Sequence, residues 1–283
     1  MPSADLSFEE LARLPDATLD LVLGAALIAR DEYPTLEPES LVAKLDELAA
    51  PLVDVGLAGA PSLVQASILS RHVFEDLGFK GNEADYYDPK NSLLPDVLER
   101  RMGIPISLAL VYTEIARRAG VDAMGVCFPG HFLVRIERNE RVGERPGAIL
   151  VDPFFGGRTL SEEDLVRMLK RIPDEGERGL RPEHTAPATA RAILVRMLVN
   201  LKSIHLSRGD DARALLMLDR IVSLTPSSAA ALKGRAMLAT KLGAHEVARA
   251  DLARALELEP DADDAPATRE TLLRLAKKRS SLN

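Results

Sequence analysis

Residues 91–135 read NSLLPDVLERRMGIPISLALVYTEIARRAGVDAMGVCFPGHFLVR, and residues 149–155 read ILVDPFF. These two stretches decide the fold of the first part of the chain. Pro105 is preorganised for the first turn of a helix, and Gly120 stops that helix after Arg118. The hydrophobic period then changes to that of a sheet, which predicts strands over 124–136 and 148–152, joined by the charged loop 138–147.

Three polar residues stand out along these elements, in the order Ser107, His131 and Asp152. Ser107 falls in the first helical turn, where free backbone N–H groups and the positive end of the helix dipole stabilise a developing anion. His131 follows a Pro-Gly kink at the start of a strand, and Asp152 ends the next strand. An antiparallel hairpin would place these two side by side. The order therefore predicts a nucleophile, a general base and an imidazole-orienting carboxylate that converge.

Upstream, residues 6–79 show apolar residues at helical spacing and predict a helical region. Residues 78–91, GFKGNEADYYDPKN, then form a loop that is too long for a simple turn, and such loops are often functional. Asn82, Tyr86, Tyr87 and Asn91 are candidates for lining a cleft or stabilising an oxyanion. In an equally open structural interpretation, Asn91 caps the next helix, predicted over 92–101, and the tyrosines pin the loop.

Beyond residue 187 the chain repeats with a period of 34 residues. The matching pairs are Leu198 and Leu232, Gly209 and Gly243, Ala214 and Ala248, Leu218 and Leu252, Leu224 and Leu258, and Pro226 and Pro260. This pattern predicts two tetratricopeptide-type helical hairpins, because each repeat has a small residue in the turn, small and large apolar residues on the second helix and a Pro that ends that helix. A last helix, over about 267–278, is expected to cover the open end. The stretch 173–187 is mostly Pro, Gly and charged residues and is interpreted as a linker between domains 1–172 and 188–283.

The strings GIPISL and PGHFLVR, with GFKGNEADYYDPKNS upstream, resemble the SirB-type transglutaminase-like family of bacteria, in which such a domain precedes tetratricopeptide repeats. The resemblance implies a papain-like core, in which a helix brings the nucleophile to a sheet whose strands carry His and then Asp. By position, Ser107 stands where true transglutaminases have Cys, and His131 and Asp152 match the catalytic His and Asp. The fold class expected is therefore α+β, with a mostly helical N-terminal region, a papain-like core and an all-α repeat pair.

The Ser at position 107 leaves two functions open. In the first, the protein is a non-catalytic, peptide- or protein-binding or regulatory protein, because a Ser hydroxyl is not ionised at rest as a Cys paired with His can be. In the second, Ser107, His131 and Asp152 form a triad that hydrolyses an amide or ester. Crosslinking by transamidation is disfavoured, because it requires a thioester.

Each site residue also has a structural interpretation. Serine is a residue that commonly accepts the free N–H groups at the start of a helix, so Ser107 can have this structural role. His131 and Asp152 fit a structural hydrogen-bonded pair in a sheet as well as they fit a catalytic pair. Cys127 could line the cleft as a displaced nucleophile, but the favoured interpretation is a buried, inert strand residue.

Composition excludes several classes of function. A net charge of -7 without a compact basic run argues against nucleic acid as a partner, so a protein or peptide partner is expected. The single cysteine cannot form an intramolecular disulfide, and the apolar run 21–29 is far shorter than the roughly 20 residues of a membrane span, so a cytoplasmic location is expected. No cofactor and no metal are predicted, because phosphate-binding glycine motifs are missing and no metal-ligand spacing relates Cys127 to His72, His184, His205 or His245.

Overall fold

The computed structural model describes residues 6–139, 142–144, 146–173 and 175–280, the last four as backbone only. Within these residues the chain forms two compact units. Unit 1 holds Leu6 and residues 15–197, and unit 2 holds residues 7–14 and 198–280. The limits predicted from sequence, with a linker at 173–187, stay a prediction. In the structure this segment contains the short helix α8 and the buried His184.

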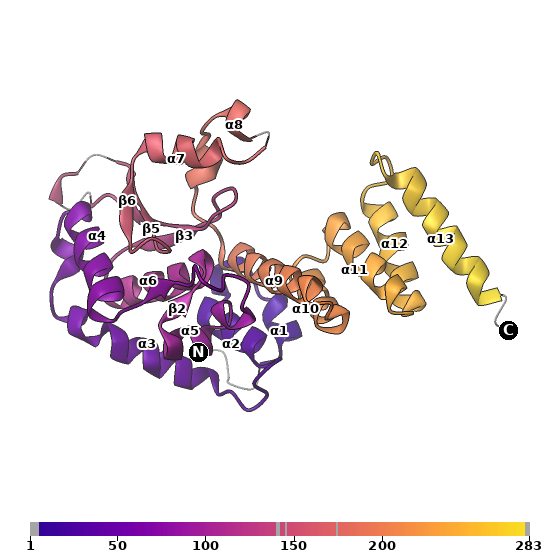
Figure 1. Ribbon diagram of the computed structural model, residues 1–283, viewed down its shortest axis with the longest axis horizontal. Helices are drawn as coiled ribbons and strands as arrows, with labels where there is room; N and C mark the ends of the chain where they lie inside the picture. Colours follow the sequence, from indigo (N-terminus) through magenta and orange to yellow (C-terminus); the bar gives the residue numbers. More distant parts are fainter. Residues whose placement is uncertain (1–5, 140–141, 145, 174, 281–283) are drawn as a thin grey trace. The chain divides into compact units, whose positions relative to one another are not determined.

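Unit 1 is a mixed α/β assembly in which helices surround a small sheet (Figure 1). Its elements are α2 (Leu21–Ala29), α3 (Pro38–Val53), α4 (Ser62–Ser70), β1 (Lys80–Gly81), α5 (Leu94–Arg100), β2 (Met102–Gly103), α6 (Pro105–Arg118), β3 (Ala123–Val126), β4 (Leu133–Glu137), β5 (Ala148–Asp152), β6 (Arg158–Leu160), α7 (Glu162–Leu169), α8 (Glu175–Arg178) and the first part of α9 (Ala190–Ser207). The expected α+β class is confirmed.

Helix α6 is the central element of unit 1. It contacts α3, α4 and α5, together with strands β3 and β4. Its residues are buried on almost every side, including Tyr112, whose side chain is inaccessible to solvent. Residues 105–112 are all buried, so the first part of α6 lies inside the core between helices and sheet. The start of α6, where Ser107 lies, is consequently held in place by packing.

The main sheet is antiparallel, in the order β3-β4-β5-β6. Val134 of β4 pairs with Val151 of β5, and Asp152 at the end of β5 pairs with Arg158 at the start of β6. A separate two-stranded sheet joins β1 and β2 in parallel and places Gly81 opposite Gly103. These registers position the polar residues at the ends of β4 and β5.

The stretch 124–136, predicted as strand with a Pro-Gly kink before His131, is divided in the structure into β3 and β4. Pro129 has no N–H to donate, and Gly130 has a φ of 66°, in the left-handed region. The chain reverses there, the backbone N–H of His131 donates to the carbonyl of Phe128 at 3.0 Å, and β4 begins at Leu133. Cys127 and His131 therefore lie in the turn between two paired strands. Of the loop predicted at 138–147, Glu140, Arg141 and Arg145 lie outside the described residues.

Unit 2 is entirely helical. It contains α1 (Phe8–Ala12), the second part of α9, α10 (Asp211–Leu224), α11 (Ala229–Lys241), α12 (His245–Leu258) and α13 (Ala265–Ser280). The repeat glycines Gly209 and Gly243 adopt φ values of 73° and 81° between paired helices, a conformation that disfavours other residues. Ala236 and Ala248 are buried where α11 meets α12, so their small side chains allow close helix packing. The structure thus has the predicted succession of two helical hairpins and a last helix.

The described residues contain no helix that is both long and apolar enough to cross a membrane.

Candidate functional site

Ser107 occupies the third position of α6 and is completely buried. Its hydroxyl Oγ lies 2.6 Å from the carbonyl oxygen of Asn91, to which it donates its proton, and 3.1 Å from the carbonyl oxygen of Ile104. It also accepts the backbone N–H of Ile104 at 3.1 Å. The hydroxyl therefore joins the start of α6 to the end of the loop before α5, which is a structural function.

His131 and Asp152 come from the β3–β4 turn and the end of β5, and the structure brings them together. Nε2 of the imidazole lies 2.9 Å from Oδ1 of Asp152, whose side chain is 1% exposed. The same Oδ1 accepts the backbone N–H groups of Phe154 at 3.1 Å and Phe155 at 3.4 Å. Arg158, opposite Asp152 in β6, places Nη2 at 3.7 Å from Oδ2. Asp152 thus orients the ring, and a neutral imidazole would carry its lone pair on Nδ1.

The complete trio is not connected by hydrogen bonds. Within the part of the chain that the structure describes, Ser107 and His131 form no hydrogen bond with one another. The proton of Ser107 is directed to the carbonyl of Asn91, which cannot act as a base. The observed geometry combines a His–Asp dyad with a buried helix-start serine.

Packing around the β1–β2 pair explains why Ser107 is occluded. A Cβ added to Gly103 would lie 2.5 Å from Ser107 Oγ, and one added to Gly81 would lie 2.7 Å from the ring of Phe154. Since Gly81 and Gly103 are partners in register, their Cβ positions face the same side of the strands. The ring of Phe154 and the hydroxyl of Ser107 therefore lie on the same side of the β1–β2 pair, next to Gly81 and Gly103 respectively.

The loop 82–92 is held by two buried asparagines. Nδ2 of Asn82 donates to Oδ1 of Asn91 at 3.0 Å, and Oδ1 of Asn82 accepts the backbone N–H of Asp85 at 3.1 Å. Nδ2 of Asn91 donates to the carbonyl of Asp85 at 2.7 Å. The N-cap of α5 is Leu93, so Asn91 does not cap that helix as one interpretation had it. Both amides instead hold the loop that presents Tyr86 and Tyr87.

These two tyrosines belong to an aromatic cluster that reaches the dyad. The ring of Tyr86 lies 5.4 Å from that of Tyr87 and 5.8 Å from that of Phe154, and Phe154 lies 5.2 Å from Phe155. His131 stacks on Phe155 with centroids 6.4 Å apart and an interplanar angle of 21°. Phe154 and Phe155 were not among the site residues predicted from the sequence. The available signal was two adjacent aromatic residues, separated from Asp152 only by Pro153, in a chain with 4% aromatic residues.

Cys127 is exposed, directly after β3, so the expectation of a buried strand residue was wrong. The strand ends at Val126 because the chain turns toward Pro129 and Gly130. Neighbouring protein atoms still crowd the thiol: desolvation raises the pKa of Cys127, and the positive charge of Arg196 partly opposes this shift. The thiolate form of Cys127 is therefore disfavoured.

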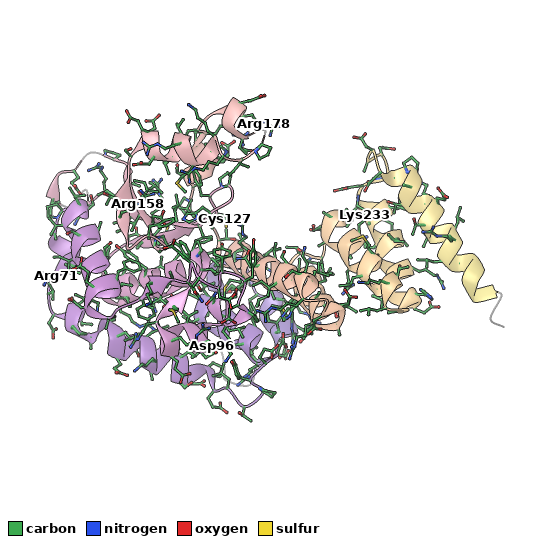
Figure 2. All side chains as sticks on the ribbon, viewed as in Figure 1. Arg71, Asp96, Cys127, Arg158, Arg178 and Lys233 are labelled. Atoms are coloured by element: carbon green, nitrogen blue, oxygen red, sulfur yellow. The ribbon has the colours of Figure 1, made fainter. Side chains whose placement is uncertain are left out.

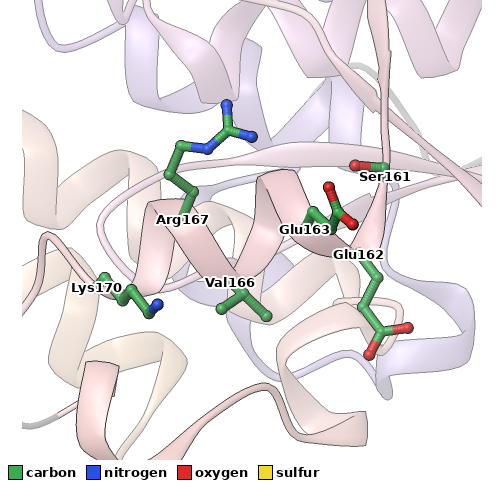
Figure 3. Close-up of a pocket in the computed structure, with 6 residues that line it drawn as sticks. All are labelled: Ser161, Glu162, Glu163, Val166, Arg167 and Lys170. Carbon is green, nitrogen blue, oxygen red and sulfur yellow. The ribbon is translucent and has the colours of Figure 1, made fainter.

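A surface hollow of about 740 Å³ follows the exposed side of α7. It is lined by Ser161, Glu162, Glu163, Val166, Arg167 and Lys170, as Figure 3 shows. None of Ser107, His131 and Asp152 lines it. Among the described residues, no three His, Cys, Asp or Glu side chains are grouped as they would be to hold a metal ion.

Comparison with known sequences shows the family to which the chain belongs. The profile of the transglutaminase-like superfamily matches residues 39–199, more than half of the chain. The chain belongs to the transglutaminase-like superfamily. A tetratricopeptide-repeat profile matches residues 201–272, so the two-part organisation suggested by the SirB-type resemblance is confirmed.

Relatives of this transglutaminase-like protein occur in bacteria and mammals. A UPF0162 protein of Xylella fastidiosa is 38% identical over 281 residues, covering 96% of this chain and 95% of the relative. A UPF0162 protein of Pseudomonas aeruginosa is 34% identical, covering 89% of this chain and 88% of the relative. Human F-box only protein 21 is 27% identical over 250 residues, which are 86% of this chain and 37% of that protein.

Proposed function

We propose that this protein is a non-catalytic member of the transglutaminase-like superfamily that binds protein or peptide partners. The observation that carries the proposal is the hydroxyl of Ser107, which is inaccessible to solvent and donates to the carbonyl of Asn91 at 2.6 Å. A nucleophilic serine needs a base within hydrogen-bond reach of its hydroxyl and an approach for the substrate. Ser107 has neither in this arrangement.

The second part of the chain supports the binding function. Tetratricopeptide repeats commonly mediate protein–protein interactions, and residues 201–272 match their profile. A transglutaminase-like domain without a working nucleophile, joined to such repeats, suits a protein that recognises other proteins. A cytoplasmic location, expected from the single cysteine, belongs to the same proposal.

Labelling of the purified protein with a fluorophosphonate, which reacts with activated serines, tests this function. We expect no labelling of the wild-type protein, beside an active serine hydrolase as positive control. Ser40→Ala is the matched control, because Ser40 has the same place in α3 that Ser107 has in α6 and donates to the carbonyl three residues earlier at 2.6 Å, but is exposed. Labelling that is lost in Ser107→Ala and kept in Ser40→Ala would refute the proposal.

One observation favours a second candidate function, hydrolysis of an amide or ester by a Ser-His-Asp triad. The His131–Asp152 pair has the 2.9 Å separation that an oriented general base requires. For this candidate, Ser107 would have to exchange its bond to Asn91 for one to Nδ1 of His131. Ser107-dependent labelling that also requires His131 would support it, and labelling that is unchanged in His131→Gln would contradict it.

A further inference from the structure

Helix α1 (Phe8–Ala12) belongs to unit 2, although the chain continues directly from it into unit 1. Residues 7–14 and 198–280 make up unit 2, whereas residues 15–197, which lie between them in the sequence, belong to unit 1. Within unit 2, α1 lies against α10 (Figure 1). The tetratricopeptide-repeat profile matches residues 201–272 and does not include α1. Helix α1 is therefore an additional helix on the repeats, supplied by a distant part of the sequence.

Arg220 of α10 connects the two helices. Its Nη1 lies 2.6 Å from Oε1 of Glu9, and its guanidinium carbon lies 4.7 Å from the centroid of the Phe8 ring. The side chain of Arg220 is 17% exposed, so it is largely shielded from water, which strengthens a cation–π contact. Phe8 and Leu11 are three positions apart, so they share one face of α1, and both are buried. An aromatic residue, an acid and a leucine therefore hold α1 in place.

The position of α1 depends on these contacts. Isolated helices shorter than about 12–15 residues are marginal in water, and α1 has 5 residues. Its capping box favours the helical shape, because Ser7 Oγ accepts the backbone N–H of Glu10 at 3.2 Å and the Glu10 carboxylate accepts the backbone N–H of Ser7 at 2.8 Å. These hydrogen bonds lie within the segment and do not attach it to the repeats. A helical segment with the same three side chains can consequently compete with α1 for the same surface.

We propose that α1 is a built-in occupant of a binding surface on α10, and that a short helical segment of a partner protein replaces it there. The partner segment has an aromatic residue, an acid directly after it and a leucine three positions after the aromatic residue, as Phe8, Glu9 and Leu11 are arranged. Its acid pairs with Arg220, and its aromatic ring packs against the guanidinium. The inference rests on the proposed function, because it takes the repeats to bind segments of other proteins. It deepens that function by naming the surface and the chemistry of the partner.

Attachment to the same chain gives α1 an advantage over any free segment. A tethered segment meets its surface at a high effective concentration, and a partner then binds only the fraction of molecules in which the surface is free. Weakening the docking of α1 should therefore strengthen binding of the partner. A helix with a purely structural role would not give this result.

Fluorescence anisotropy with a fluorescein-labelled peptide of residues 6–14, LSFEELARL, tests the inference on the full-length protein. The peptide should bind the wild type weakly, because α1 occupies the surface. Glu9→Lys places a like charge beside Arg220 and should raise the affinity for the peptide at least about fivefold. Because the side chain of Glu9 is 55% exposed, this substitution leaves the buried Phe8 and Leu11 in place. Equal affinities of the wild type and Glu9→Lys, or binding by neither, would overturn the inference.

The matched control is Lys233→Gln, which changes a charged residue elsewhere in the same unit. Lys233 of α11, labelled in Figure 2, pairs with Asp264 at 2.7 Å and Glu259 at 3.7 Å. This variant should bind the peptide as weakly as the wild type does. If Lys233→Gln raises the affinity as much as Glu9→Lys, the change is not specific to α1 and the inference is wrong.

A charge reversal locates the surface on α10. Full-length Arg220→Glu should prefer a peptide that carries Glu9→Lys over the unchanged peptide by at least about tenfold, because the ion pair is restored with opposite signs. Full-length Glu9→Lys, which keeps Arg220, should have the opposite preference. A peptide that carries Phe8→Ser should bind neither protein. The same preference in both proteins would place the peptide away from Arg220 and contradict the inference.

The result that overturns the inference differs from the one that overturns the proposed function. Unchanged peptide affinity in Glu9→Lys removes α1 as an occupant and leaves a protein-binding function in place. Labelling of Ser107 by a fluorophosphonate would instead overturn the proposed function, and the peptide titrations do not depend on that reaction.

Discussion

Replacing Ser107 by Ala should destabilise unit 1 by about 2 kcal/mol, because a buried polar group left without its partner costs about 1–3 kcal/mol. The substitution removes the acceptor of the Ile104 N–H at 3.1 Å and the donor to the Asn91 carbonyl at 2.6 Å. In the variant, the backbone N–H of Ile104 can still donate to the carbonyl of Asn91, from which it lies 3.4 Å. The expected loss of stability is therefore smaller than the cost of leaving both groups without a partner. For a unit of this size, 2 kcal/mol corresponds to a fall in Tm of about 4–8 °C.

Urea and thermal unfolding followed by far-UV circular dichroism and tyrosine fluorescence measure this effect, since the chain has no Trp. Ser40→Ala removes a hydroxyl from the same helical position on the surface and should change stability by less than about 0.5 kcal/mol. If Ser107→Ala unfolds together with the wild type, or no earlier than Ser40→Ala, the hydroxyl does not have the structural role assigned to it.

Three further predictions concern Arg235, Tyr112 and Cys127. Arg235→Ala should destabilise unit 2 by about 3 kcal/mol or more, because it leaves the carboxylate of Asp251, which is 4% exposed, without its partner at 2.6 Å. Arg254→Ala, the control, removes an ion pair on the surface and should cost less than about 0.5 kcal/mol. Equal urea midpoints for the two variants would contradict this prediction. Burial raises the pKa of Tyr112, so the folded state keeps this phenol protonated at a pH where the unfolded chain ionises it. Stability should therefore fall as the pH rises above about 10, more steeply in the wild type than in Tyr112→Phe, and identical pH slopes of the urea midpoint would argue against it. Because desolvation raises the pKa of Cys127, iodoacetamide should alkylate this thiol at pH 8 more slowly than it alkylates a cysteine peptide. A rate equal to or above that of the peptide would show that the thiol is not desolvated.

Much of the local structure could be predicted because local signals were strong. Pro105 and the apolar residues after it predicted α6 with its observed limits, Pro105–Arg118, and the alternating apolar residues predicted β5 over Ala148–Asp152. The period of 34 predicted two helical hairpins and a last helix. The Pro-Gly kink before His131 was recognised from the sequence, but the apolar residues on both sides of it hid the ends of the strands, so 124–136 was not divided into β3 and β4.

The contacts of the site could be predicted only in part. Placing Asp152 beside His131 needed no more than the chain order of two neighbouring strands. The bond of Ser107 to Asn91 depends on how the loop 82–92 packs against α6, which no periodicity encodes. Similarly, Tyr86 and Phe154 are far apart in sequence and meet because the loop and the end of β5 converge.

The sequence by itself determined the order of helices and strands, the repeat and the superfamily, because spacing, turn residues and motif strings are properties of neighbouring residues. Tertiary structure alone decided what the polar residues do. Burial directed the proton of Ser107 to a backbone carbonyl, and the convergence of the loop with β5 gathered the exposed aromatics around His131. The physical reason is that hydrogen-bond partners and solvent access depend on segments distant in sequence, whose relative positions are set only when the core packs.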